Sequence, residues 1–217
     1  MPVSLFPQGP ANAGIDLSVA IAEVEIALNA ANAADLEPWA EGDLYDWIDE
    51  GAKRLARTCG VFVERDTSNT IALHTASYGL PEGHLSTIHA SAGTLSLYPA
   101  SVQELEALDG DWVDTIGPTN TFLMDTAGMT AARLYPSPDG TVTGALALIC
   151  AEFPPVINSG NTLLEAPPVV QDYLKWHAIA EARRRQSDYA MPDVAERLQS
   201  WCEVFERVAM EYWGTAQ

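Results

Sequence analysis

Two of the four histidines, His84 and His89, fall in the stretch "YGLPEGHLSTIHASAGTLSLYPAS" at residues 78–101. With a carboxylate such as Glu82 they could hold a metal ion that activates water, which is the chemistry of a small metal-dependent hydrolase. Zinc sites usually have closer ligand spacing and include Cys or a further His. We therefore interpret both histidines as surface or half-buried side chains, and we predict no catalytic residues, no metal and no cofactor.

The motifs of other enzyme classes are absent from the sequence. It contains no G-x-S-x-G, no G-x-G-x-x-G and no phosphate-binding loop. Cys59, Cys150 and Cys202 are widely spaced, form no C-x-x-C and are odd in number, so we expect buried thiols in a reducing cytosol and no disulfides. The sequence thus favours a protein that is not an enzyme.

Charged side chains gather at two places along the chain. Asp43, Asp46 and Glu50 share one side of an expected helix, where they form a metal-binding edge or, more commonly, a solvated acidic face. The basic run "EARRRQ" at 181–186 either docks on an acidic partner or suits the C-terminal end of its own helix. The sequence leaves both alternatives open for the basic run.

The overall charge excludes several kinds of partner. Thirty acidic and 11 basic residues give a net charge of −19. Gripping DNA or an anionic membrane requires clustered Lys and Arg, so specific binding to either is not expected. The first residues lack the features of a signal peptide, and the apolar stretch "GALALIC" is too short to span a bilayer.

Apolar residues at helical spacing predict helices toward both ends of the chain. They cover about 17–28, with Asp16 as N-cap, and 44–58, with Gly60 after the last turn; two more begin near Pro167 and Pro192. In the last helix we expect a buried seam with coiled-coil spacing that packs on the other helices. It consists of Val194, Leu198, Trp201, Phe205, Val208 and Tyr212.

The middle of the chain changes to short alternating strands between about 70 and 152, with a turn at 137–140. Ser101 and Glu104 form a capping box for a short helix there. The predicted fold is α+β, a helical bundle built from both chain ends with an inserted antiparallel β-domain. We expect an extended N-terminal arm at 1–15, a bundle from 16–60 and 167–213, and the insert at 61–166.

A series of short motifs runs across roughly residues 40–213. They are "LYDWIDEGAKRLAR", "YGLPEGHLSTIHA", "LYPASVQELEAL" followed by "GDW", "IGPTNTFLM", "LYPSPDG", "ALALICAEFPPVI" and "PPVVQDYLKWHAIAEA". In type and order these motifs resemble those of bacteriophage head–tail adaptor proteins, also called connector or neck proteins. Two differences are a longer, Pro/Gly-rich first 40 residues and a chain that stops four residues after Trp213, where a long C-terminal arm is expected.

The resemblance implies a structural virion protein made in the host cytoplasm. Such proteins form a ring of copies, commonly a dodecamer, beneath the portal, and attach tail, nozzle or other neck proteins. DNA passes through the ring without being specifically bound, and the acidity of the chain suits that passage. Another phage neck or tail-completion protein is the alternative from the same class.

Four apolar or aromatic residues are candidates for contacts with these partners. Leu5 and Phe6 lie between prolines in the expected arm, which could insert into a groove of the portal or of a neighbouring subunit. Trp112 and Trp213 lie near the ends of expected elements, where aromatic side chains can anchor an interface.

Overall fold

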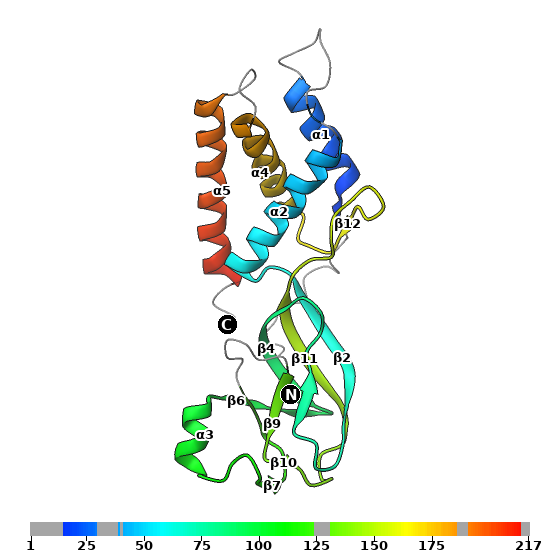
Figure 1. Ribbon diagram of the computed structural model, residues 1–217, viewed down its shortest axis with the longest axis vertical. Coiled ribbons are helices and arrows are strands. Elements are labelled where there is room, and N and C mark those ends of the chain that lie inside the picture. Colours follow the sequence, from blue (N-terminus) through cyan, green and yellow to red (C-terminus); the bar gives the residue numbers. More distant parts are fainter. Residues whose placement is uncertain (1–14, 30–38, 40, 124–130, 186–190, 214–217) are drawn as a thin grey trace. The chain divides into compact units, whose positions relative to one another are not determined.

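A computed structural model of the chain describes residues 15–29, 39, 41–123, 131–185 and 191–213. The fold is α+β, as predicted, with helices at both ends and strands between them (Figure 1). The chain divides into two compact units. Unit 1 comprises the described residues up to Phe62 and from Phe153 onward, and unit 2 comprises Val63–Glu152. Leu5, Phe6 and the rest of the predicted arm before Ile15 lie outside the described residues.

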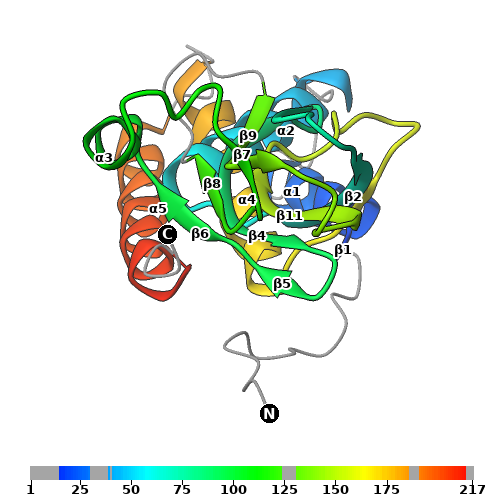
Figure 2. The ribbon, with the colours of Figure 1, turned by 90° about the horizontal axis from the view of Figure 1, so that it is seen from below.

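Unit 1 consists of four helices and a short strand pair. The helices are α1 (Leu17–Asn29), α2 (Glu41–Cys59), α4 (Val169–Arg185) and α5 (Pro192–Trp213), and the strands β1 (Ile15–Asp16) and β12 (Leu163–Leu164) pair in antiparallel fashion. Helix α4 packs against each of the other three helices. Figures 1 and 2 show α1 and α5 on opposite sides of α4.

Local signals place most ends of these helices where the sequence predicts them, but α2 begins at Glu41, three residues before the predicted start. The Asp16 carboxylate accepts hydrogen bonds from both the backbone and the hydroxyl of Ser18 at the start of α1. Helix α2 ends at Gly60, which adopts a φ of 57° and donates its N–H to the Ala56 carbonyl at 3.0 Å. The predicted starts of the last two helices, after the Pro167–Pro168 pair and at Pro192, are also confirmed.

Helices α2 and α4 approach closely at Gly51. A Cβ atom at this position would lie 3.0 Å from Cγ and Nδ1 of His177, so any larger residue would require the buried imidazole to shift by a few tenths of an ångström. His177 Nδ1 donates to the Trp47 carbonyl at 3.2 Å. Burial lowers the pKa of His177, which keeps the ring neutral at pH 7.

Unit 2 contains two four-stranded sheets, and Figure 2 labels all strands of the first sheet. The first sheet has the antiparallel order β2 (Val63–Ile71), β11 (Gly144–Glu152), β4 (His84–Ala92), β5 (Leu95–Ser96). The second has the order β3 (Ser77–Gly79), β9 (Ala131–Tyr135), β8 (Thr121–Leu123), β6 (Tyr98–Ala100). Strands β6 and β8 are parallel, as are the short strands β7 (Ile116–Gly117) and β10 (Ser137–Pro138), so the unit is not purely antiparallel.

Residues of both sheets share one apolar core. Its buried members are Ile71, Tyr78, Ala90, Ala92, Leu97, Phe122, Ala132, Leu134, Leu146, Leu148 and Cys150. The stretch from Tyr78 to Ser101 contributes strands to both sheets. Tyr78 also donates its hydroxyl to the Thr75 carbonyl at 2.8 Å, so the tyrosine of the Y-x-L-P motif holds the preceding loop.

The short helix α3 (Val102–Leu108) has the capping box that the sequence predicts. The Ser101 hydroxyl accepts from the Glu104 N–H at 3.2 Å, and the Glu104 carboxylate accepts from the Ser101 N–H at 2.8 Å. Ala100, Leu105 and Leu123 form a small buried cluster under this helix.

Candidate protein–protein interface

Helix α5 turns a row of large apolar side chains toward solvent. The exposed fractions are 48% for Trp201, 56% for Val204, 59% for Val208 and 70% for Tyr212. Their spacing of three and four residues places them on one side of the helix. A contiguous exposed apolar surface of this kind is typical of a surface that another chain covers.

The prediction that α5 buries its seam of apolar residues is therefore wrong. Of the six seam residues, Trp201, Val208 and Tyr212 are exposed, and Val194, Leu198 and Phe205 are only partly buried. The side of α5 that faces the bundle carries Ala195, Cys202, Glu206 and Ala209 instead. Three of these side chains are short and allow close approach of the helices, and the fourth is a carboxylate with partners inside the bundle.

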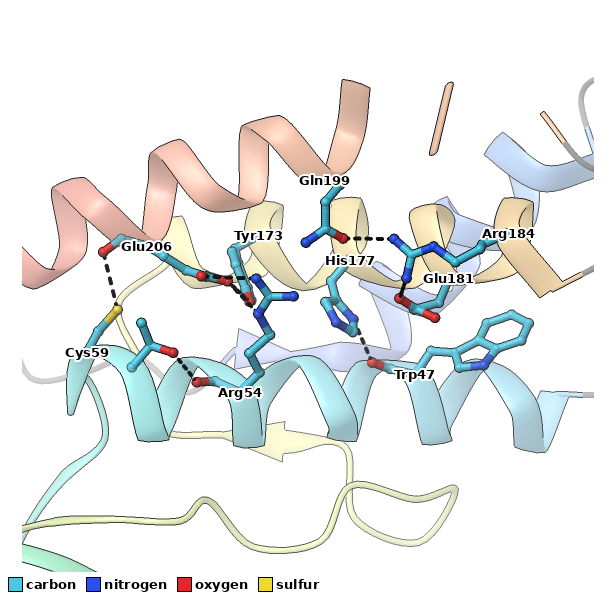
Figure 3. Close-up of polar contacts among 10 residues, drawn as sticks. Trp47, Arg54, Cys59, Tyr173, His177, Glu181, Arg184, Gln199 and Glu206 are labelled. Carbon is cyan, nitrogen blue, oxygen red and sulfur yellow. Dashed lines mark hydrogen bonds and ion pairs between the residues drawn. The ribbon is translucent and has the colours of Figure 1, made fainter. Parts of the chain in front are cut away.

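Glu206 joins α5 to both α2 and α4 (Figure 3). Its carboxylate accepts from Arg54 Nε at 2.8 Å and Nη2 at 3.1 Å, and from the Tyr173 hydroxyl at 2.8 Å. Only 8% of Glu206 is exposed. Rotating α5 about its axis to bury the predicted seam would therefore remove these partners and leave the Glu206 charge unpaired. The Glu206 contacts thus fix the rotation of α5 and leave its large apolar residues outside.

The surroundings of Glu206 are those of a structural network. Burial, together with the Glu206 carboxylate, raises the pKa of the Tyr173 hydroxyl. Burial also raises the pKa of the Cys59 thiol to about 11 and that of Cys202 to about 12, so both stay protonated at neutral pH. All three cysteines are buried and free, as the sequence predicts.

The exposed side of α5 and the adjoining part of α4 form a groove of about 720 Å³. Its walls are almost wholly apolar and rich in aromatic rings: Val169, Trp176, Trp201, Val204, Phe205, Val208, Ala209 and Tyr212. The Trp176 and Trp201 rings meet edge to face at 5.6 Å between centroids, and Phe205 lies 5.2 Å from the Tyr173 ring. These contacts fix the aromatic walls, so the groove is preformed.

The three arginines of the basic run are engaged within unit 1. Arg183 is buried and donates to the Leu28 carbonyl at 3.2 Å. Arg184 pairs with Glu181 and donates to Gln199 at 3.0 Å, as Figure 3 shows. Arg185 lies 3.4 Å from the Glu50 carboxylate. Of the two alternatives, the structure favours a role within the unit over an acidic docking partner.

The described residues cover only part of the predicted interface set. Leu5 and Phe6 lie outside the described residues, and Trp213 ends α5 with a side chain that the structure does not describe. Trp112 lies in unit 2, partly buried beside the α3 cluster, with the Arg133 guanidinium 4.9 Å above its ring. The side chain is in part packed within unit 2 and in part exposed.

His84 and His89 both lie in β4, and neighbouring hydroxyl groups bond their rings. His84 Nε2 is 3.0 Å from Thr87 Oγ1, and His89 Nε2 is 3.5 Å from Ser96 Oγ. Within the described part of the chain, no three His, Cys, Asp or Glu side chains are arranged to hold a metal ion. Nor is any described helix long and apolar enough to cross a membrane.

Sequence reasoning missed Trp176 and Val204 as parts of the groove. A signal for them was present in α5. Ala195, Cys202 and Ala209 recur every seven residues, and such a row of small side chains is a second candidate for the packed side of a helix. Taking that row as buried places Val204 and Val208 on the exposed side. Nothing comparable in the sequence identifies Trp176.

Comparison with known proteins gives one family match. The family model described as SU10 adaptor protein matches residues 16–212, which include all helices of unit 1 up to the last turn of α5 and the whole of unit 2. No curated protein matches the chain.

Proposed function

The chain belongs to the SU10 adaptor proteins, a family of phage head–tail adaptors, and from this premise we propose that it forms a ring beneath the portal of a phage capsid. The ring extends the DNA channel and gives tail, nozzle or other neck proteins a platform for attachment. The protein is a structural part of the virion and catalyses no reaction. The family match over residues 16–212 is the observation that carries this proposal.

The surface chemistry of unit 1 supports an assembly role. A preformed aromatic groove suits contact with another protein chain, because burying its walls releases ordered water and adds well-packed ring contacts. The arginines support the absence of a DNA-binding patch, since Arg183 is buried and Arg184 and Arg185 are paired with carboxylates. A net charge of −19 supports passage of DNA without adhesion.

Four residues remain proposed contact points with partners. We place Leu5 and Phe6, in the arm at residues 1–15, in a groove of the portal or of a neighbouring subunit. Trp112 and Trp213 are proposed anchors toward the remaining neck proteins. We propose a dodecamer as the ring, and the acidic copies stay monomers or small oligomers until a portal supplies the template.

Portal binding tests the proposal directly. The purified chain is mixed with portal-bearing heads, and sedimentation and electron microscopy follow its attachment. It should sediment with these heads and add ring-shaped density below the portal vertex. It should not bind heads that lack the portal. Attachment only to tails would favour a tail-completion protein, and a shift of duplex DNA in a gel at physiological salt would contradict the proposed indifference to DNA.

A further inference from the structure

We propose that the groove between α4 and α5 is the docking site for residues 1–14 of a neighbouring copy of this chain, with Phe6 as the anchoring side chain. This inference rests on the proposed function, because the ring brings the neighbouring copy into reach. It goes further by naming the surface, the occupant and the anchor.

The groove has the chemistry of a site for an apolar segment rich in proline. Its walls carry Trp176, Trp201, Phe205 and Tyr212, and almost no polar surface. Grooves lined by aromatic rings commonly bind proline-rich segments, which lose little conformational entropy because proline already restricts the backbone. A charged or strongly polar occupant would lose its water in this groove without finding hydrogen-bond partners.

The sequence holds one segment with the matching composition. Residues 1–14, "MPVSLFPQGPANAG", contain three prolines, Val3, Leu5 and Phe6, and no charged side chain. Phe6 is the only aromatic residue in this segment and would bury the most apolar surface. The segment leaves the described structure at Ile15, which is paired with Leu164 in the β1–β12 ladder.

The segment begins close to one end of the groove. Leu164 precedes the groove residue Val169 by five positions, a chain distance of at most about 18 Å. Fourteen residues in a polyproline conformation span about 43 Å, and the nine steps from Ile15 to Phe6 span about 28 Å. The segment is therefore long enough for Phe6 to reach the groove of its own chain or that of a neighbouring copy.

The uncharged segment can reach a neighbouring copy even though charge opposes contact between the folded units. Each copy carries a net charge of −19, so bringing two folded units together opposes like charges. Residues 1–14 carry no charged side chain, and they can cross to the next copy without adding to that repulsion. Apolar burial in the groove then supplies the attraction that the acidic surfaces lack.

Disulfide trapping on the full-length chain tests this contact without a portal. Ser4→Cys beside the anchor is combined with Val208→Cys in the groove, where 59% of Val208 is exposed. The matched control combines Ser4→Cys with Ile26→Cys, since Ile26 is also apolar and 68% exposed but lies on α1. The three native cysteines are buried and will not compete.

At high protein concentration under mild oxidation, the variant with cysteines at positions 4 and 208 should give linked dimers and small oligomers, at least tenfold faster than the control. Adding Phe6→Ala, or adding Trp201→Glu, should abolish the excess over the control. Ile26→Glu, which adds the same charge at an exposed apolar position outside the groove, should leave it unchanged. Circular dichroism of every variant verifies that the fold is kept.

Equal rates in the two cysteine pairs would overturn the inference. A link formed only within single chains would overturn it too, because the segment would then fill its own groove. The proposed function is judged separately, by attachment of the unmodified chain to portal-bearing heads. Trapping without attachment would refute the adaptor role alone, and attachment without trapping would refute the docking site alone.

Discussion

The two units of this protein bury different kinds of side chain. The core of unit 2 is apolar, and the buried polar residue among its described positions is Thr119. Unit 1 buries Glu206, His177 and Arg183. Apolar burial has no preferred direction, whereas hydrogen bonds to a buried charge require one arrangement. Unit 2 thus buries its large apolar residues in its own core. Unit 1 instead buries polar groups and leaves aromatic residues on its surface.

This difference has a consequence for assembly. A helix whose rotation is fixed by Glu206 cannot turn its aromatic side inward when no partner is present. The cost of keeping that side exposed is recovered when another chain covers it. Unit 1 therefore owes its exposed aromatic surface, the proposed docking site, to the same contacts that hold its helices together.

The largest expected effect of a single substitution lies in unit 2. Leu148→Ala removes a side chain with 0% exposure from the shared core, and should lower the free energy of unfolding by about 2–5 kcal/mol. Hydrogen exchange resolved by residue should place the loss in both sheets. Leu95→Ala, at a position 41% exposed, is the control and should cost much less. Equal losses for the two variants would mean that unit 2 lacks a common core.

Removing the carboxylate in unit 1 should have the next largest effect. Glu206→Ala leaves the Tyr173 hydroxyl and the Arg54 guanidinium without their acceptor, which should cost about 2–3 kcal/mol, less than a wholly buried pair because Arg54 is partly solvated. Urea denaturation measures the loss. Glu203→Ala, an exposed position on α5, is the control and should be near neutral. An unchanged midpoint for Glu206→Ala would show that this network does not hold α5.

The aromatic surface should contribute less to stability than a buried seam would. Trp201→Ala should cost about 1 kcal/mol, mainly for the lost edge-to-face contact with Trp176, whereas a buried tryptophan costs about 3–5 kcal/mol. The same variant should lose assembly with other copies. A denaturation loss above about 3 kcal/mol would mean that the groove is closed in solution and would contradict the exposed position of Trp201.

The smallest expected effect is a pH dependence in unit 2. Burial, with the neighbouring Glu64 and Asp66 carboxylates, raises the pKa of Glu152 from 4.5 to about 7. A carboxyl whose pKa is higher in the folded state stabilises the fold below pH 4.5, and this contribution is lost as the pH rises through about 7.

Denaturation of the wild type and of Glu152→Gln at several pH values measures this contribution. The variant should match the wild type below pH 4.5 and exceed its stability above pH 7, because the substituted amide side chain carries no charge at any pH. Glu106→Gln, at an exposed position on α3, should follow the wild type throughout. Parallel pH curves for Glu152→Gln and the wild type would show that Glu152 has an ordinary pKa.

Local features of the fold could be predicted because their causes lie within a few residues. Ser101 and Glu104 satisfy each other's backbone groups, and Pro192 suits the first turn of a helix. The parallel pairing of β6 with β8 could not be predicted, since hydrophobic alternation identifies a strand but not its partner. The roles of the three arginines also depend on acceptors, such as the Leu28 carbonyl and Glu50, that are far away in the sequence.

The sequence by itself determined the α+β class, the helix ends, the buried thiols and the family of this protein. Each depends on residue type, short spacing or the order of motifs, which the linear chain contains. Only the tertiary structure decided which side of α5 faces inward. Two rows of residues on that helix have spacing suited to packing, one of small side chains and one of large apolar side chains. Judged by apolar area alone, burying the large row would stabilise the fold more. The small row is buried because Glu206 finds Arg54 and Tyr173 only in that orientation.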